Sequence, residues 1–184
     1  LTLTGANTYT GTTTVSAGVL NIQNATGLGV TAGGTSVSTG AALQLQGGIS
    51  VGAEALTLSG TGVSADGALL NISGTNTYGG LVTLGSASRI NSDAGTLTLS
   101  NAGTITGAGF DLTVGGGGNT TIAGILGTTT GTLTKDGAGT LTLSGANTYT
   151  GLTTVSAGAL AIGSSGSLFS GNALTVGTSG TADF

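Results

Sequence analysis

Residues Gly137–Gly163 read GAGTLTLSGANTYTGLTTVSAGALAIG, and this stretch sets the pattern for the whole chain. The chain opens with nearly the same letters, LTLTGANTYTGTTTVSAGVLNI at Leu1–Ile22, and a looser version, ALLNISGTNTYGGLVTL, lies at Ala68–Leu84. The tripeptide Asn-Thr-Tyr therefore begins at three positions, Asn7, Asn76 and Asn147. The intervals between them are 69 and 71 residues. Such even spacing is typical of a repeat architecture.

The motif contains three short predicted strands. In Gly139–Gly145 leucines alternate with threonine and serine, the period-2 pattern of a strand with one buried face. A second strand is expected at Leu152–Val155, and a third follows Gly158. The side chains predicted to face the core are Leu141, Leu143, Thr153, Val155, Leu160 and Ile162.

The segments between these strands are turns. Gly145–Thr148 and Ser156–Gly158 supply residues that tolerate positive φ or form side-chain turns. One unit thus spans about 20–25 residues, too few to bury its own apolar face, so that units must stack on one another. About three units fill each interval between motif copies.

The composition supports an ordered protein with few charged residues. Among 184 residues are 39 glycines, 38% hydrophobic and only 4% charged residues, with no proline, cysteine or histidine. Low charge and ample apolar content oppose disorder. The net charge of −4, with Arg89 and Lys135 as the two basic residues, gives no electrostatic signature for nucleic acid.

No run of apolar residues is long enough for a membrane-spanning helix, and the first residues form part of the motif rather than a signal peptide. The first copy begins at Leu1, the equivalent of Leu141, without the preceding Gly-Ala-Gly-Thr. We therefore expect the chain to be a single β-helix segment, residues 1–184, cut from a longer repeat polypeptide.

The two full copies resemble the passenger-associated transport repeat, also called the autotransporter-associated β-strand repeat. Ala68–Leu84 resembles it in part and departs from it at Gly79, where the other copies have Thr10 and Thr150. The resemblance implies a right-handed parallel β-helix in a bacterial secreted or surface protein, with a role in secretion and folding of the passenger. It implies no catalytic residues.

The six carboxylates give little support for an enzyme. Cleavage of polysaccharides needs two carboxylates facing one pocket, and no two of these six lie at i and i+2 on one strand. Without histidine or cysteine, catalytic triads and zinc sites are excluded as well. We expect the carboxylates to be solvated corner residues: Glu54, Asp66, Asp93, Asp111, Asp136 and Asp183.

One weak metal candidate is Asp111, within the glycine-rich run Gly107–Gly118. The run is faintly similar to the calcium-binding nonapeptide of β-rolls, but no second aspartate follows at that spacing. The favoured interpretation is that these glycines allow the chain to bend at a corner and that Phe110 caps the core. No cofactor is expected.

Thr-x-Thr pairs are the pattern that ice-binding solenoids display as a flat lattice. The pairs begin at residues 2, 96, 132 and 140, a spacing too irregular for one pair on every turn of one face. The alternative is that these β-branched residues favour strand conformation and solubilise the surface.

The repeated Asn-Thr-Tyr has two interpretations. The asparagines at 7, 76 and 147 could bind a polar ligand, although closing a turn with the side-chain amide is favoured. Tyr9, Tyr78 and Tyr149 could stack on sugars, or pack over the adjoining corner.

These observations predict an all-β fold, a right-handed parallel β-helix with about three strands per turn and roughly eight turns, about 40 Å tall at about 4.8 Å per turn. The predicted function is a non-catalytic stalk or fibre segment of an extracellular bacterial surface protein. Alternatives are a ligand-binding adhesin module for glycans or a host surface, an ice-binding protein and a polysaccharide-cleaving enzyme. The expected partner is more of the same chain or another copy, joined end to end.

Overall fold

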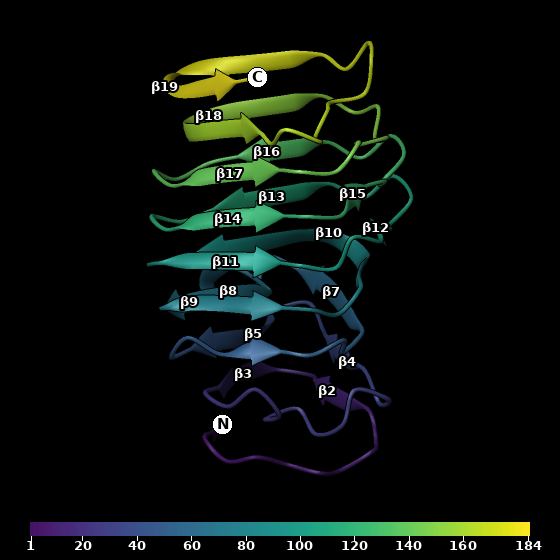
Figure 1. Cartoon of the computed structure of the whole chain (residues 1–184), viewed down its shortest axis with the longest axis vertical. Helices are drawn as coiled ribbons and strands as arrows, with labels where there is room; N and C mark the ends of the chain where they lie inside the picture. Colours follow the sequence, from purple (N-terminus) through teal and green to yellow (C-terminus); the bar gives the residue numbers. More distant parts are fainter.

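The computed structural model describes all residues, Leu1–Phe184, as a parallel β-solenoid of about eight turns. The turns lie one above another, with the two termini at opposite ends of the stack (Figure 1). Every strand pairing is parallel, and the one helical segment is the short 3-10 helix η1 (Val63–Ala65). No helical segment has the length and hydrophobicity of a membrane span. The predicted β-helix is confirmed.

The chain visits three sides of the solenoid in a fixed order, here named sides A, B and C. Side A is the stack of strands that begins with the second strand of the first motif copy. Its ladder is continued beyond β10 by the bridge between Thr83 and Thr106. Side A contains β2 (Thr13–Val15), β4 (Thr35–Val37), β7 (Leu56–Gly60), the first part of β10 (Val82–Ser92), β12 (Thr104–Ile105) and β15 (Ile125–Leu126).

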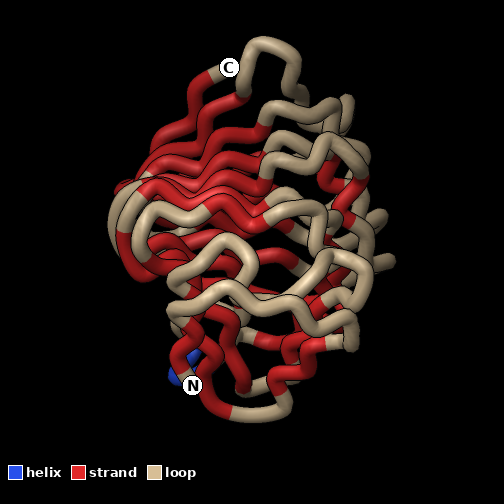
Figure 2. The backbone as a smooth tube through the Cα atoms, turned by 60° about the horizontal axis from the view of Figure 1, so that its bottom comes forward, coloured by secondary structure: helices blue, strands red, loops and turns tan.

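Side B is the most continuous of the three stacks and extends from the first strand to the last. Neighbouring strands of successive turns run side by side along it (Figure 2). It contains β1 (Thr2–Leu3), β3 (Gly18–Ile22), β5 (Ala41–Gln46), β8 (Leu69–Ser73), the second part of β10, β13 (Leu112–Gly115), β16 (Leu133–Lys135), and the first parts of β18 (Thr153–Ile162) and β19 (Leu174–Asp183).

Side C lies at the front of Figure 1, where its strands are stacked directly above one another. From β9 to β18 its ladders pair without a register shift. It contains β6 (Ser50–Val51), β9 (Thr75–Tyr78), β11 (Thr96–Leu99), β14 (Asn119–Ile122), β17 (Thr140–Leu143), and the second parts of β18 and β19.

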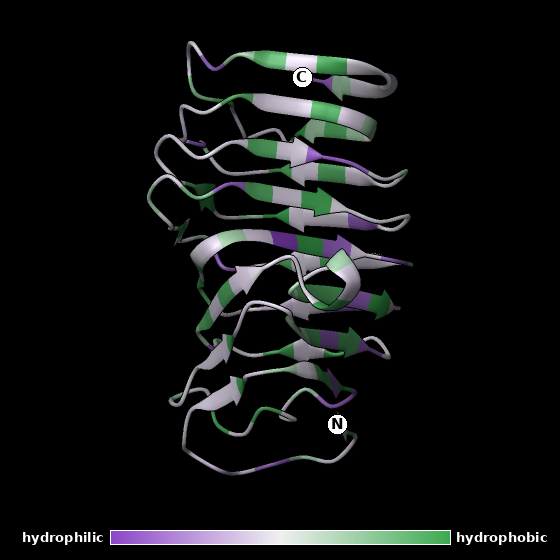
Figure 3. Cartoon of the chain, turned by 180° about the vertical axis from the view of Figure 1, so that it is seen from behind, coloured by the Kyte–Doolittle hydropathy of each residue, from purple (hydrophilic) through white to green (hydrophobic).

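The core is a column of inward side chains that stack from turn to turn. Hydrophobic and hydrophilic bands alternate along the strands (Figure 3), as expected when one face of each strand is buried. One such column, on side B, is formed by Leu20, Leu43, Leu69, Ile90, Val114, Lys135, Val155 and Val176. Seven of its eight members are apolar, so that the one lysine stands out.

The inward positions predicted for the motif are confirmed with one correction. Leu141, Leu143, Thr153, Val155 and Leu160 are fully buried. Ile162 is only partly buried, because it is the last residue of β18 and the pairing with β19 ends one residue earlier, at Ala161.

The predicted turn at Ser156–Gly158 is a bend within one strand rather than a break. β18 runs through it, with a register shift between Val155 and Ala157. Gly158 takes φ of 69°, as does its equivalent Gly18 in the first copy. A residue with a side chain is strained at this φ, which explains glycine at both bends.

The copies of the motif do not all occupy the same sides. In the first copy the leading strand, β1, lies on side B and the second strand, β2, on side A. In the last copy β17 lies on side C, and Thr153–Val155 on side B. The motif therefore determines which residues form strands and which form corners. The lengths of the turns between the copies determine on which side of the solenoid each strand lies.

We predict that Leu143→Asp destabilises the turns around it by about 4 kcal/mol, because an unpaired carboxylate would replace a fully buried apolar side chain. Thr142→Asp, one residue away and facing outward, is the control and should change stability by less than about 0.5 kcal/mol. Denaturant unfolding measures both variants. Equal stability of Leu143→Asp and the unmodified chain would contradict the strand assignment.

Candidate functional site

The asparagine of the motif closes the corner between turns. The Oδ1 atom of Asn147 accepts the backbone N–H of Leu126 at 2.8 Å, and its Nδ2 atom donates to the carbonyl oxygens of Gly145 at 2.9 Å and Ser167 at 2.7 Å. Asn76 accepts the N–H of Ile49 at 2.7 Å in the same way. Both side chains are buried. The turn-closing interpretation is therefore confirmed for these two copies.

The tyrosine of the motif packs inside the solenoid. Tyr149 is fully buried, and its hydroxyl lies 2.7 Å from Thr153 Oγ1. Burial raises the pKa of this phenol, and the hydrogen bond to Thr153 partly offsets the rise. Stacking of sugars on this ring is excluded by its burial, as it is for Tyr78.

The middle copy breaks this tyrosine–threonine pair. Val82 stands at the position of Thr153, and the buried Tyr78 hydroxyl has no hydrogen-bond partner. Burial, together with the nearby Glu54 carboxylate, raises the pKa of Tyr78 far above its ordinary value. This copy therefore keeps the ring and loses its polar contact.

Glu54 is not a solvated corner residue, as the sequence predicted, but is buried, with 2% of its surface exposed. One carboxylate oxygen accepts the hydroxyl of Thr35 at 3.0 Å, and the other has no partner. Burial raises the pKa of Glu54, and the Thr35 hydrogen bond lowers it by less. No pattern in the sequence indicated this burial, since Glu54 follows a corner rather than an alternating strand.

The two basic residues lie in one cluster on side B. Arg89 binds Asp136 through two bonds of 2.8 Å, two turns further along the stack. The ion pair passes over Gly115, where a Cβ atom would lie 2.2 Å from both side chains. A side chain at 115 would therefore displace the two groups from this geometry.

Lys135 occupies an inward position, with 2% of its surface exposed. Its Nζ atom donates to the carbonyl oxygens of Asp136 at 2.7 Å and Gly137 at 2.9 Å. Burial lowers its pKa; Asp136 opposes this effect and Arg89 adds to it. The alternation of Leu133 with Lys135 in the sequence was the signal that could have placed this lysine inside.

Asp111, the weak metal candidate, accepts the backbone N–H of Thr132 at 2.8 Å. No group of three or more carboxylates, histidines or cysteines gathers around it or elsewhere. Phe110 does not cap the core, because it lies at an exposed corner where Gly107 and Gly109 turn the chain with positive φ.

The outward threonines are more regular in space than in sequence. The pairs at 96 and 140 lie on side C together with Thr75 and Thr77 and with Asn119 and Thr121, whereas the pairs at 2 and 132 lie on side B. The first residues of these side C pairs follow one another at intervals of 21, 23 and 21 residues. Each of four consecutive turns therefore contributes one pair. This threonine array consists of Thr75 and Thr77, Thr96 and Thr98, Asn119 and Thr121, Thr140 and Thr142.

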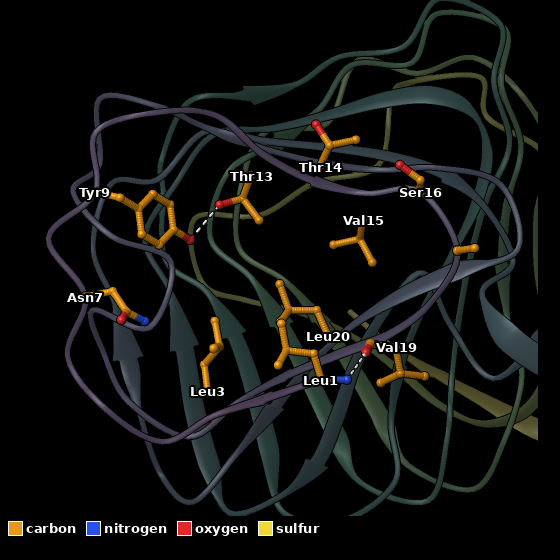
Figure 4. A pocket seen from close by; sticks show the side chains of 11 residues that line it. Leu1, Leu3, Asn7, Tyr9, Thr13, Thr14, Val15, Ser16, Val19 and Leu20 are labelled. Atoms are coloured by element: carbon orange, nitrogen blue, oxygen red, sulfur yellow. Dashed lines mark hydrogen bonds between the residues drawn. The ribbon is translucent and has the colours of Figure 1, made fainter.

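A cavity of about 500 Å³ opens at the N-terminal end of the core. Asn7, Tyr9 and Thr13 lie at its edge in Figure 4, with the Tyr9 hydroxyl 2.7 Å from Thr13 Oγ1. The apolar side chains that line it include Leu1, Leu3, Val15, Val19 and Leu20.

The raised pKa of Glu54 predicts that acid stabilises this protein locally. The folded state binds the proton more tightly than the unfolded state, so the contribution of Glu54 is fully present below pH 4.5 and is lost as pH rises through the folded pKa. Glu54→Gln should raise the melting temperature at pH 7 and flatten its pH dependence above pH 4.5. Asp66→Asn, at an exposed carboxylate, is the control. A melting temperature of Glu54→Gln below that of the unmodified chain at pH 7 would contradict the prediction.

We predict that calcium leaves the stability unchanged, because the Asp111 carboxylate already binds a backbone N–H and belongs to no group of three or more possible metal ligands. Thermal melts with millimolar calcium and with chelator measure this. A rise of several degrees that chelator reverses, and that Asp111→Asn abolishes, would show a metal site.

One comparison with known proteins gives a match. A family model described as the passenger-associated transport repeat matches residues 1–22 and 133–162. No curated protein and no solved structure matches the chain. The middle segment Ala68–Leu84 lies outside both matched regions, although its Asn76 closes a corner as Asn147 does. The chain is thus a parallel β-solenoid that carries the passenger-associated transport repeat near both of its ends, as its sequence pattern indicated.

Proposed function

We propose that this chain is a structural, non-catalytic segment of the stalk or fibre of an autotransporter-type passenger, outside the bacterial cell. The repeat supports a secreted or surface-exposed β-helical passenger segment. The stalk role is supported by one observation, the apolar N-terminal face of the solenoid, where β1 pairs with β3 alone and Leu1 is exposed.

The first copy of the motif can be compared with the last copy, residue by residue. Leu141 and Tyr149 are fully buried under the preceding turn, whereas the equivalent Leu1 is 81% exposed and Tyr9 is 39% exposed. The last copy is covered by β14 and by Leu126, which also donates its N–H to Asn147. No strand of the chain occupies the equivalent position next to the first copy.

Asn7 shows the same difference at atomic detail. Its Nδ2 atom donates to the carbonyl of Gly27 at 2.8 Å, as Asn147 does to Ser167 in the turn that follows. Its Oδ1 atom accepts no bond within the chain, where Asn147 accepts the N–H of Leu126. The side chain is therefore positioned for the backbone N–H of one more turn.

The occupant that fits this face is another turn of parallel β-solenoid with an apolar inward strand. Its backbone would pair with the free edge of β1, its apolar side chains would fill the cavity, and its N–H would reach Asn7. The C-terminal turn of a second copy provides these groups. At the other end, β19 pairs only with β18 and leaves its second edge free, because residues 178–183 form part of this strand rather than a cap.

We predict that the isolated chain assembles end to end. Light scattering should show a mass that rises with concentration, and small-angle scattering a growing length at constant cross-section. Leu3→Glu should weaken assembly by at least about a hundredfold, because desolvating an unpaired carboxylate costs at least about 3 kcal/mol. Thr134→Glu, outward on side B, is the matched control and should assemble normally.

A monomer at all concentrations, or a Leu3→Glu variant that assembles as well as the unmodified chain, would overturn the proposed end contact. A glycan array is the second measurement. Saturable binding of one glycan class would favour the adhesin alternative over a purely structural role.

A further inference from the structure

Side C carries a surface that the proposed stalk function does not use. The threonine array covers four consecutive turns, with two outward residues in each, and seven of these eight are threonine. Most of its side chains are half-buried, with Thr75 and Asn119 exposed. Asn119 uses its side-chain oxygen to accept the N–H of Thr140 at 2.9 Å.

The threonine hydroxyls of the array have no hydrogen-bond partner within the protein. Outward threonines on side B, such as Thr113, Thr134 and Thr154, likewise have no partner, whereas Thr106 binds Thr83 on side A and Thr150 binds the carbonyl of Thr129. A half-buried hydroxyl without a protein partner must bind solvent. The array therefore holds water at seven repeated positions.

The spacing of these hydroxyls is fixed in two directions. Along the stack the parallel ladders place equivalent residues about 4.8 Å apart, and along each strand residues i and i+2 lie about 6.6 Å apart. The ladders of β9, β11, β14, β17 and β18 have no register shift. Threonine is stiff at χ1, so that the hydroxyls and methyl groups repeat with the backbone.

The chemistry of the array fits ordered water better than a macromolecule. It has no charged side chain and no exposed aromatic ring, since Tyr78 is turned inward from the same strand as Thr75 and Thr77. Protein partners are bound chiefly through tyrosine, tryptophan and arginine. A two-dimensional lattice of hydroxyl and methyl groups instead matches a surface in which water oxygens repeat at similar distances.

From this geometry we infer that the threonine array on side C binds the surface of ice. The hydroxyls take the place of water oxygens in the outer layer of the crystal, and the methyl groups lie between them. The other two sides lack this arrangement. On side B one outward row contains Thr113, Thr134, Thr154 and Thr175, but it continues to Arg89 and has no second threonine row beside it. On side A one row of hydroxyl residues continues while its neighbours form loops.

The test is to measure inhibition of ice recrystallisation by the full chain and the fraction of protein that enters slowly growing ice. Thr98→Tyr with Thr121→Tyr alters two paired residues at the centre of the array. Because the ring prevents close approach, the fraction bound should fall by about tenfold or more, a change of about 1.4 kcal/mol or more in binding free energy. Thr98→Lys with Thr121→Lys should have the same effect.

The matched control is Thr134→Tyr with Thr154→Tyr, a paired outward couple on side B, which should keep the full activity. Circular dichroism and melting temperature establish that each variant is folded. The inference is overturned if the unmodified chain is excluded from ice, if the side C variants bind as it does, or if the side B control loses activity equally. Binding to crystalline polysaccharide in place of ice would also overturn it.

Discussion

The whole structure depends on the stacking of inward side chains between turns. A turn of about 20 to 26 residues has one apolar face and no second layer to cover it, so each turn is stable only between two others. Each buried leucine or valine contributes about 2 kcal/mol on removal from water. The column from Leu20 to Val155 continues this contact through seven turns. An interruption at any turn would leave apolar side chains exposed on both sides of it.

Polar groups occur inside this stack where the backbone can satisfy them. Asn76 and Asn147 replace hydrogen bonds that the chain loses when it turns a corner. Lys135 bends its ammonium group out of the core to the corner carbonyls. Glu54 differs from these, since one of its oxygens remains without a partner and its pKa rises. Buried polar side chains are therefore tolerated where corner backbone groups bind them, whereas the partly unpaired carboxylate of Glu54 lowers the stability of the fold.

The same stacking orders the outside of the molecule. Parallel ladders without register shift place outward residues above one another as regularly as inward ones. Arg89 and Asp136 use this order to span two turns, and the threonine array uses it to repeat a hydroxyl lattice. The N-terminal end of the stack differs from its middle. There the residues that would contact a neighbouring turn line a cavity instead.

The sequence by itself determined the fold class, the inward residues of the motif and the role of its asparagine, because alternation along a strand and the conformations allowed at a corner are local properties of the chain. It also placed Lys135 in line with Leu133, although this was not recognised. Only the tertiary structure decided which residues meet across turns. Turns of different length bring residues 75, 96, 119 and 140 into one row and move the motif copies to different sides. Burial of Glu54 depends likewise on the turns on either side of it, since no local pattern sets how a corner is covered.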